Sequence, residues 1–109
     1  MDDQATFVRS NRDGRATLVV SGEIDIVTAP YLRDEIAAAI GEAESTIVVD
    51  LSGVTFIDSS GLGVLIDART AIDEAAVTLV LLNPTEACRR VLELTGTAVL
   101  FEIVDGDLP

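Results

Sequence analysis

Hydrophobic positions along the chain alternate between short β-rich runs and longer stretches with helical spacing. The β-rich runs predict strands at 5–10, 15–22, 46–51, 77–82 and 100–104. The first helical stretch has apolar residues at intervals of three and four, at Leu32, Ile36, Ala39, Ile40 and Ala43. A second helix is predicted at about 60–73, and a third ends at Gly96.

The connections between these elements predict the topology of the sheet. Asn11-Arg12-Asp13-Gly14 is typical of a hairpin turn, because Asp-Gly tolerates positive φ, so the first two strands are predicted to be antiparallel. Each later pair of strands is joined through a helix, and such a link makes the strands parallel. The sequence therefore predicts an α/β fold with the order ββαβαβαβ, in a single domain over 1–109. Its mixed sheet has an N-terminal antiparallel hairpin, then parallel strands, with helices packed against it.

Proline marks the start of the first and the last predicted helix. Thr28 is the expected N-cap of the first helix, with Pro30 in the first turn, where its missing N–H costs nothing. The segment Asn83-Pro84-Thr85-Glu86 combines a capping Asn, Pro at the first helical position and Glu three residues after the cap. We therefore expect the last helix to begin directly after Asn83.

Composition and charge exclude several classes of function. All 7 basic residues are Arg, against 19 acidic residues, for a net charge of −12, with no His and 1 Cys. Without His or Lys, the chain has no imidazole-activated nucleophile, P-loop lysine or Schiff base, and a single Cys makes no internal disulfide or Cys-rich zinc site. We therefore expect no enzyme activity, no metal site and no cofactor.

The acidic balance also argues against nucleic acid and membranes as partners, because both select basic patches. The N-terminus, Met1-Asp2-Asp3-Gln4, is acidic where a signal peptide has a basic region. We see no apolar run of the length of a membrane span, about 18 residues. The expected location is the cytoplasm.

The segment 54–65 places a polar, glycine-containing motif, Asp58-Ser59-Ser60-Gly61, between a strand and a helix. Free N–H groups and the helix dipole at such a helix start favour an anion, and Gly61 and Gly63 would let another molecule approach the backbone. A simpler interpretation is that Asp58 or Ser59 is an N-cap and the glycines serve packing. A nucleophilic serine or a Rossmann fingerprint does not fit, because a base, the Gly-x-Ser-x-Gly spacing and a third glycine are absent.

A serine at this position is suited to receive a phosphate rather than to attack a substrate. Phosphorylation of Ser59 would add about −1.5 to −2 charges, which a helix N-terminus tolerates. The added charge would lie beside Asp58 on an acidic surface and would disturb an apolar contact with a partner. These are the properties of an on/off interface.

Several blocks of the sequence, in order, resemble the STAS domain, and within it the stand-alone bacterial anti-sigma factor antagonists. The blocks are Val20-Ser21-Gly22-Glu23-Ile24-Asp25, the segment 47–63, and Asn83-Pro84 followed by 91–96. The resemblance covers about 17–104 and rests on the joint order and spacing of these blocks. One departure is the turn at 73–76, which is often glycine-rich in the family and contains no glycine here.

The resemblance implies a function. Such proteins bind a serine-kinase anti-sigma factor and free the sigma factor that it holds. The kinase phosphorylates the first Ser of the motif, which is Ser59 here, the phosphorylated form no longer binds, and a PP2C-type phosphatase restores it. ATP and Mg²⁺ would then belong to the kinase, and this chain would be a substrate and switch.

The motif and the resemblance together predict a partner-binding set: Asp25, Asp58, Ser59, Ser60, Gly61, Leu62 and Gly63. Three of these have open alternatives. Asp25 matches an acidic position near the switch serine in the family, but Asp is equally typical of a turn. Ser60 is the expected helix cap, and Leu62 is either an exposed anchor or, as for most leucines, a core residue.

A second hypothesis keeps the fold and removes the switch. STAS-like domains also serve as regulatory subunits of transporters or of larger signalling assemblies, and the Ser59 region would then be a docking surface that is never phosphorylated. We expect a monomer, with a homodimer as the alternative.

Overall fold

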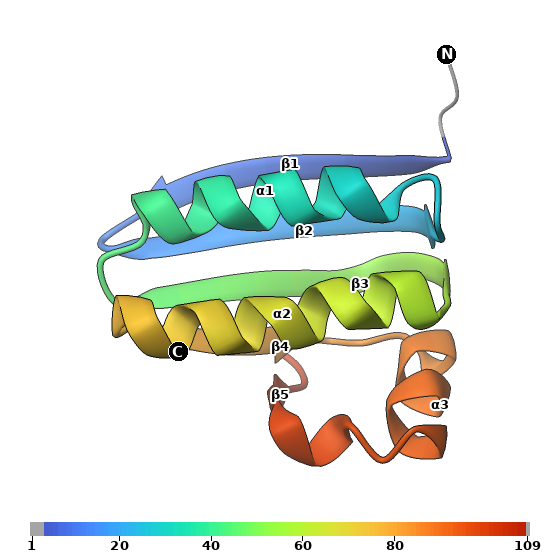
Figure 1. Ribbon diagram of the computed structural model, residues 1–109. Coiled ribbons are helices and arrows are strands. Elements are labelled where there is room, and N and C mark those ends of the chain that lie inside the picture. The colour runs from blue at the N-terminus through green and yellow to red at the C-terminus, as the bar shows by residue number, and fades with distance from the viewer. Residues whose placement is uncertain (1–3, 109) are drawn as a thin grey trace.

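The computed structural model describes residues 4–108 and contains one five-stranded sheet with the strand order β1-β2-β3-β4-β5 (Figure 1). The strands are β1 (Ala5–Arg12), β2 (Arg15–Ile24), β3 (Thr46–Ile57), β4 (Thr78–Leu82) and β5 (Glu102–Val104). β1 is antiparallel to β2, and the other neighbours are parallel. The predicted mixed sheet and the order ββαβαβαβ are confirmed.

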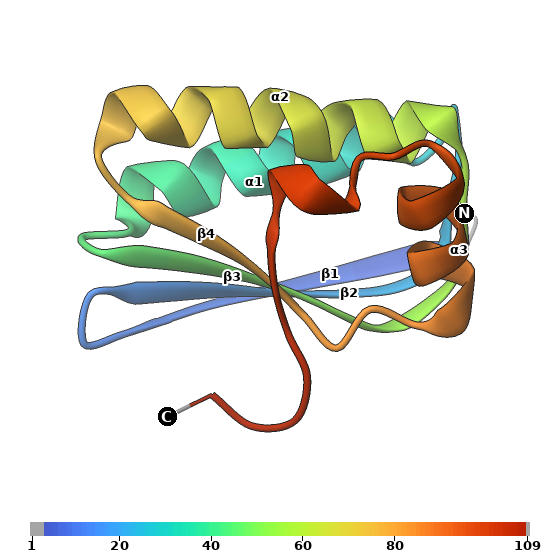
Figure 2. The ribbon, with the colours of Figure 1, turned by 90° about the horizontal axis from the view of Figure 1, so that it is seen from below.

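The helices are α1 (Ala29–Glu42), α2 (Ser59–Ala75) and α3 (Glu86–Leu94), with a short 3-10 helix, η1 (Ala98–Leu100). α1 and α2 lie side by side on one face of the sheet (Figures 1 and 2). α3 packs near the end of β3, where the Thr85 hydroxyl donates to the Val54 carbonyl at 2.7 Å. None of the helices formed by residues 4–108 combines the length and apolar character needed to span a bilayer.

The core lies between the sheet and the pair α1 and α2. Alternate residues of β2 and β3 point into it, which is the periodicity that strand geometry imposes, and they meet the apolar stripe of α1 at Leu32, Ile36 and Ala39. The inward strand residues are Ala16, Leu18, Val20, Ile47, Val49 and Leu51. This packing orients both helices so that α1 and α2 begin at the same end of the sheet (Figure 1).

The hairpin turn is tighter than the predicted four residues. β1 and β2 remain paired as far as Arg12 opposite Arg15, so only Asp13 and Gly14 form the turn, with φ of 55° and 82°. Two central residues with positive φ match the twist of the flanking strands. The pairing therefore extends the first strand two residues beyond the predicted end.

The predicted end of the third strand at residue 51 is wrong, because β3 continues to Ile57. Its pairing with β2 continues through register shifts between Val19 and Ser21 and between Gly22 and Glu23. Gly53 makes this possible, since a Cβ there would lie 2.4 Å from the Ser21 hydroxyl oxygen. The bulged pairing carries β3 to the point where the site begins.

Of the two predicted helix caps, one is confirmed in position and the other is wrong. Thr28 is the N-cap residue of α1, with Pro30 in the first turn, but its side chain makes no capping hydrogen bond; its hydroxyl donates to the Glu23 carbonyl at 2.8 Å instead. Asn83 has a φ of 49°, outside the extended region that a cap needs, and its side chain pairs in both directions with the backbone of Gly106. Thr85 is the N-cap of α3, accepting from the Cys88 N–H at 3.4 Å.

Candidate functional site

The site is built where β3 ends and α2 begins. Asp58 has extended backbone, with φ of −118°, and its carboxylate accepts a hydrogen bond from the Ser60 N–H at 2.8 Å. Asp58 is therefore the N-cap of α2, as the simpler interpretation of the motif allowed. The expectation that Ser60 is the cap is wrong, because Ser60 lies inside the first turn and supplies the donor.

Ser59 is the first residue of α2, and its side chain is exposed. Among residues 4–108 its hydroxyl has no hydrogen-bond partner. No hydrogen bond within this part of the chain must therefore be broken before the hydroxyl oxygen reacts. The first N–H groups of a helix have no helical carbonyl to pair with, and Asp58 occupies that of Ser60. The geometry can hold an added anion close to the remaining donors.

Gly61 and Gly63 differ in their surroundings. Gly61 is buried, and a Cβ there would lie 2.6 Å from Ile24 Cγ2 and 2.8 Å from Ile57 Cγ1. Its lack of a side chain lets the start of α2 pack closely on the ends of β2 and β3. A Cβ on Gly63 would meet nothing within 4 Å, so only Gly63 leaves open space for another molecule.

Leu62 belongs to the core. Its relative exposure is 6%, and it is part of the apolar cluster between helices and sheet. The alternative that Leu62 packs in the core is therefore correct, and its side chain does not anchor a partner. A contact through its backbone stays a prediction.

Asp25 lies next to the start of α2, because the Asp58 N–H donates to the Ile24 carbonyl at 3.2 Å. The pairing of Ile24 with Ile57 brings the ends of β2 and β3 to the same edge of the sheet. Asp25 and Ser59, each one residue beyond this hydrogen bond, therefore lie at one end of the molecule. The structure brings together these two predicted site residues.

The Asp25 carboxylate accepts hydrogen bonds within the loop between β2 and α1, at whose start Asp25 lies. One oxygen accepts from the Val27 N–H at 2.9 Å and the Thr28 N–H at 3.2 Å, and the other accepts from the Gln4 side-chain amide. Partial burial raises the pKa of Asp25, but the hydrogen bonds from Val27, Gln4 and Thr28 outweigh it and hold the pKa below its ordinary value of 3.8. Asp25 thus acts as a turn residue, and a direct contact with a partner stays a prediction.

Exposed apolar side chains at this end were missed by the sequence reasoning. Ile26 and Val27 lie in the loop after Asp25, Tyr31 lies in the first turn of α1, and Phe56 lies near the end of β3. The available signal was Ile26-Val27, an apolar pair that belongs to neither the preceding strand nor the face of the following helix. These side chains give the end around Ser59 an apolar character.

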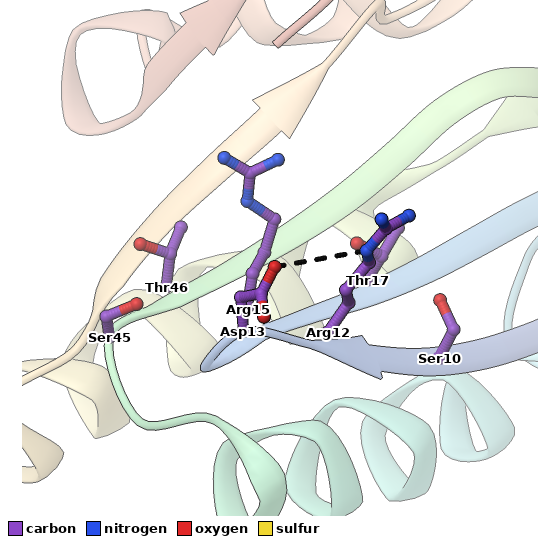
Figure 3. A pocket seen from close by; sticks show the side chains of 7 residues that line it. All are labelled: Ser10, Arg12, Asp13, Arg15, Thr17, Ser45 and Thr46. Atoms are coloured by element: carbon purple, nitrogen blue, oxygen red, sulfur yellow. Dashed lines mark ion pairs between the residues drawn. The ribbon is translucent and has the colours of Figure 1, made fainter. Parts of the chain in front are cut away.

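A cavity of about 480 Å³ lies at the other end of the sheet, beside the hairpin turn (Figure 3). It is polar, and Arg12 and Asp13 form an ion pair of 3.9 Å across it. Both side chains are almost fully exposed, so water screens their attraction. This cavity shares no residue with the predicted site.

Comparison with known proteins gives the family. The model of the STAS domain matches residues 7–105. The chain belongs to the STAS domain family. The sequence resemblance over 17–104 is thereby confirmed and extended at its start.

Relatives of this STAS domain include stand-alone anti-sigma factor antagonists. It is 31% identical to an anti-sigma-B factor antagonist of Listeria monocytogenes over 93 residues, which cover 84% of this chain and 82% of the relative. The crystal structure of an anti-sigma factor antagonist from Mycobacterium paratuberculosis is 35% identical, with a TM-score of 0.79, over 94% of this chain and 87% of that one.

The Bacillus protein SpoIIAA, also an anti-sigma factor antagonist, has been solved in two states. The unphosphorylated form is 25% identical with a TM-score of 0.78, covering 94% of this chain and 89% of that one. The phosphorylated form is 25% identical with a TM-score of 0.72, covering 94% and 92%. This STAS domain is thus similar to proteins named as antagonists of anti-sigma factors.

Proposed function

We propose that this STAS domain binds a serine-kinase anti-sigma factor, and thereby releases the sigma factor that it holds, until phosphorylation of Ser59 ends the contact. The observation that carries the proposal is the Ser59 hydroxyl, exposed on the first residue of α2 beside the Asp58 cap. The names of the relatives supply the class of partner.

The switch follows from the charge that a phosphate adds. A phosphoserine brings about −1.5 to −2 charges at neutral pH. The helix start can accommodate it, so the fold is retained. Asp58 and Asp25 already make this end acidic, and the exposed side chains of Ile26 and Phe56 give it apolar area. A phosphate there would have to be desolvated against an apolar group of the partner, which would weaken the contact.

In this proposal the chain has no catalytic role and needs no cofactor. The anti-sigma kinase supplies ATP and Mg²⁺, and a PP2C-type phosphatase removes the phosphate and restores binding. Sigma factors act in the cytoplasm, so the domain would work there as well.

Phosphorylation of Ser59 is tested with purified proteins. The chain is incubated with each anti-sigma serine kinase encoded in the same genome and with ATP, and the modified residue is mapped by mass spectrometry. We expect one phosphate, on Ser59, and none in Ser59→Ala. Thr55→Ala removes another exposed hydroxyl outside the predicted partner-binding set, so it is the matched control and should retain phosphorylation. A Ser59→Ala variant that is still phosphorylated to the wild-type extent would contradict the proposal.

The binding switch is tested with Ser59→Asp and calorimetry. We expect weaker binding to the kinase, while the free energy of unfolding changes by only about 0.3–1 kcal/mol, because an acid at a helix N-terminus is mildly favourable. Unchanged affinity, or a large loss of stability, would argue against an exposed switch at this serine.

A further inference from the structure

Three exposed apolar side chains lie next to the site, and two of them, Val27 and Tyr31, line one side of a groove. Ile26, Val27 and Tyr31 have relative exposures of 75%, 59% and 61%, and they are close in sequence between the end of β2 and the first turn of α1. Behind Val27 and Tyr31 a groove of about 270 Å³ opens between β1 and α1. Its other walls include Ala5 and Phe7 of β1 and Glu35 of α1.

The size of the groove indicates what it can hold. Small-molecule sites usually measure about 300–1,000 Å³, and this groove lies just below that range. It is open to solvent and has apolar walls on both sides from Phe7, Val27 and Tyr31. These dimensions suit an apolar side chain presented by another protein, in the manner of an anchor residue that fills a pocket.

The groove is preformed, because hydrogen bonds hold the loop that makes its wall. The Asp25 carboxylate accepts from the N–H groups of Val27 and Thr28 and from the Gln4 amide. The Thr28 hydroxyl donates to the Glu23 carbonyl at 2.8 Å, and the Glu23 N–H donates to the Gln4 carbonyl at 2.8 Å. Because these hydrogen bonds already hold the loop in place, it loses little conformational freedom when a partner binds, and the entropic cost of association is lower.

The charge around the groove limits the partner. Glu23 and Asp34 are exposed near it, and Glu35 lies in its wall. The Arg9 guanidinium is already engaged by Glu35 and by Glu42 at 3.4 Å. In a chain with a net charge of −12, the complementary surface carries an apolar side chain flanked by Lys or Arg.

We propose that the groove between β1 and α1 receives an apolar side chain of the anti-sigma factor, flanked by a basic residue, and so selects among anti-sigma factors. This inference rests on the proposed function. The hydrogen bond between Asp58 and Ile24 places the groove loop next to the start of α2, so one partner can cover both. The phosphorylation state of Ser59 then controls whether a complex forms, and the groove determines which anti-sigma kinase is bound.

The test measures the dissociation constant for the anti-sigma serine kinases encoded in the same genome, by calorimetry with the full chain. We expect Val27→Ser combined with Tyr31→Ser to weaken binding to the preferred kinase at least tenfold. The matched control is Leu94→Ser combined with Val99→Ser. Those two residues are even more exposed, at 81% and 89%, and lie outside the groove, so binding should stay within twofold of wild type.

A second variant fills the groove without removing its apolar walls. Ala5→Leu adds volume from β1, and we expect it to weaken binding at least fivefold while thermal unfolding confirms a folded protein. Wild-type affinity in both the double variant and Ala5→Leu would contradict the proposed role of the groove while leaving the proposed function intact. Failure of the wild-type chain to bind any of these kinases would overturn both.

Discussion

Gly61 and Gly63 are two residues apart, and the structure gives their missing side chains different consequences. Gly61 allows the start of α2 to approach Ile24 and Ile57, whereas the space above Gly63 is empty. A glycine within a helix lowers stability by about 0.5–1 kcal/mol relative to alanine. At Gly63 no neighbouring atom of the chain would clash with a side chain, so packing within the domain does not explain this loss of stability. A glycine there is consistent with the backbone of a partner approaching closely.

Alanine substitutions at the two glycines should therefore have opposite effects on the free energy of unfolding. Gly63→Ala is expected to raise it by about 0.5–1 kcal/mol, whereas Gly61→Ala is expected to lower it by about 1–3 kcal/mol, because the added methyl group overlaps Ile24 and Ile57. Urea unfolding measures both. If Gly63→Ala also weakens binding to the anti-sigma kinase, the open space is used by the partner; a destabilised Gly63→Ala would contradict the packing argument.

The start of α2 is held by one residue, Asp58, through both its side chain and its backbone. The Asp58 carboxylate accepts from the Ser60 N–H, the Asp58 N–H is held by the Ile24 carbonyl, and its own carbonyl accepts from the Leu62 N–H at 3.0 Å. Asp58 therefore connects the end of β2 to the first turn of α2. The position of Ser59 depends on this connection.

Asp58→Ala is expected to lower the free energy of unfolding by about 1 kcal/mol, the usual cost of removing an N-cap. For a domain of this size the melting temperature should fall by about 4–8 °C. Asp58→Asn is the matched control, because the amide oxygen can still accept from Ser60, and most of the stability should return. Calorimetric scans compare the three proteins. Equal losses in Ala and Asn variants would mean that charge, and not capping, is what matters at this position.

The whole molecule carries 19 acidic residues against 7 Arg, so its carboxylates greatly outnumber their basic partners. The ion pairs of Arg9, Arg33 and Arg89 lie at the surface, where each contributes little. Net self-repulsion therefore opposes the compact state, and the same field attracts a basic partner.

Added salt should have opposite effects on folding and on association. Screening weakens the self-repulsion, so the free energy of unfolding should rise between 50 and 500 mM NaCl. Over the same range the association rate with the anti-sigma kinase should fall roughly tenfold, because electrostatic steering is screened. Urea titration and stopped-flow fluorescence measure these two quantities. An association rate independent of salt would argue against a basic surface on the partner.

Much of the fold and part of the site could be predicted from the chain itself. Strands and helices appeared where the local apolar spacing placed them, since Leu32, Ile36 and Ala39 form the buried stripe of α1. The motif at 58–61 predicted a helix start with a serine in its first turn, which the structure confirms. These features depend on neighbours within about one helical turn, and their signals are therefore local.

The failures share a different cause. Asn83 was predicted to be a cap, but its side chain pairs with Gly106. Thr28 does occupy the N-cap position of α1, but its hydroxyl pairs with Glu23 and makes no capping hydrogen bond. β3 extends to Ile57 because a bulged partner strand continues beside it. In each case the deciding contact comes from another element or from outside the helix, so local patterns carried no signal of it.

The sequence by itself determined the order of the elements, the mixed sheet, the acidic surface and the serine at the start of α2, because composition and short-range periodicity specify them. Only the tertiary structure decided which glycine packs and which stays open, that Leu62 is buried, and that Asp25 holds a loop. It alone placed Val27 and Tyr31 opposite Phe7 across a groove. Such relations depend on how separate elements pack together, and packing is a property of the folded chain as a whole.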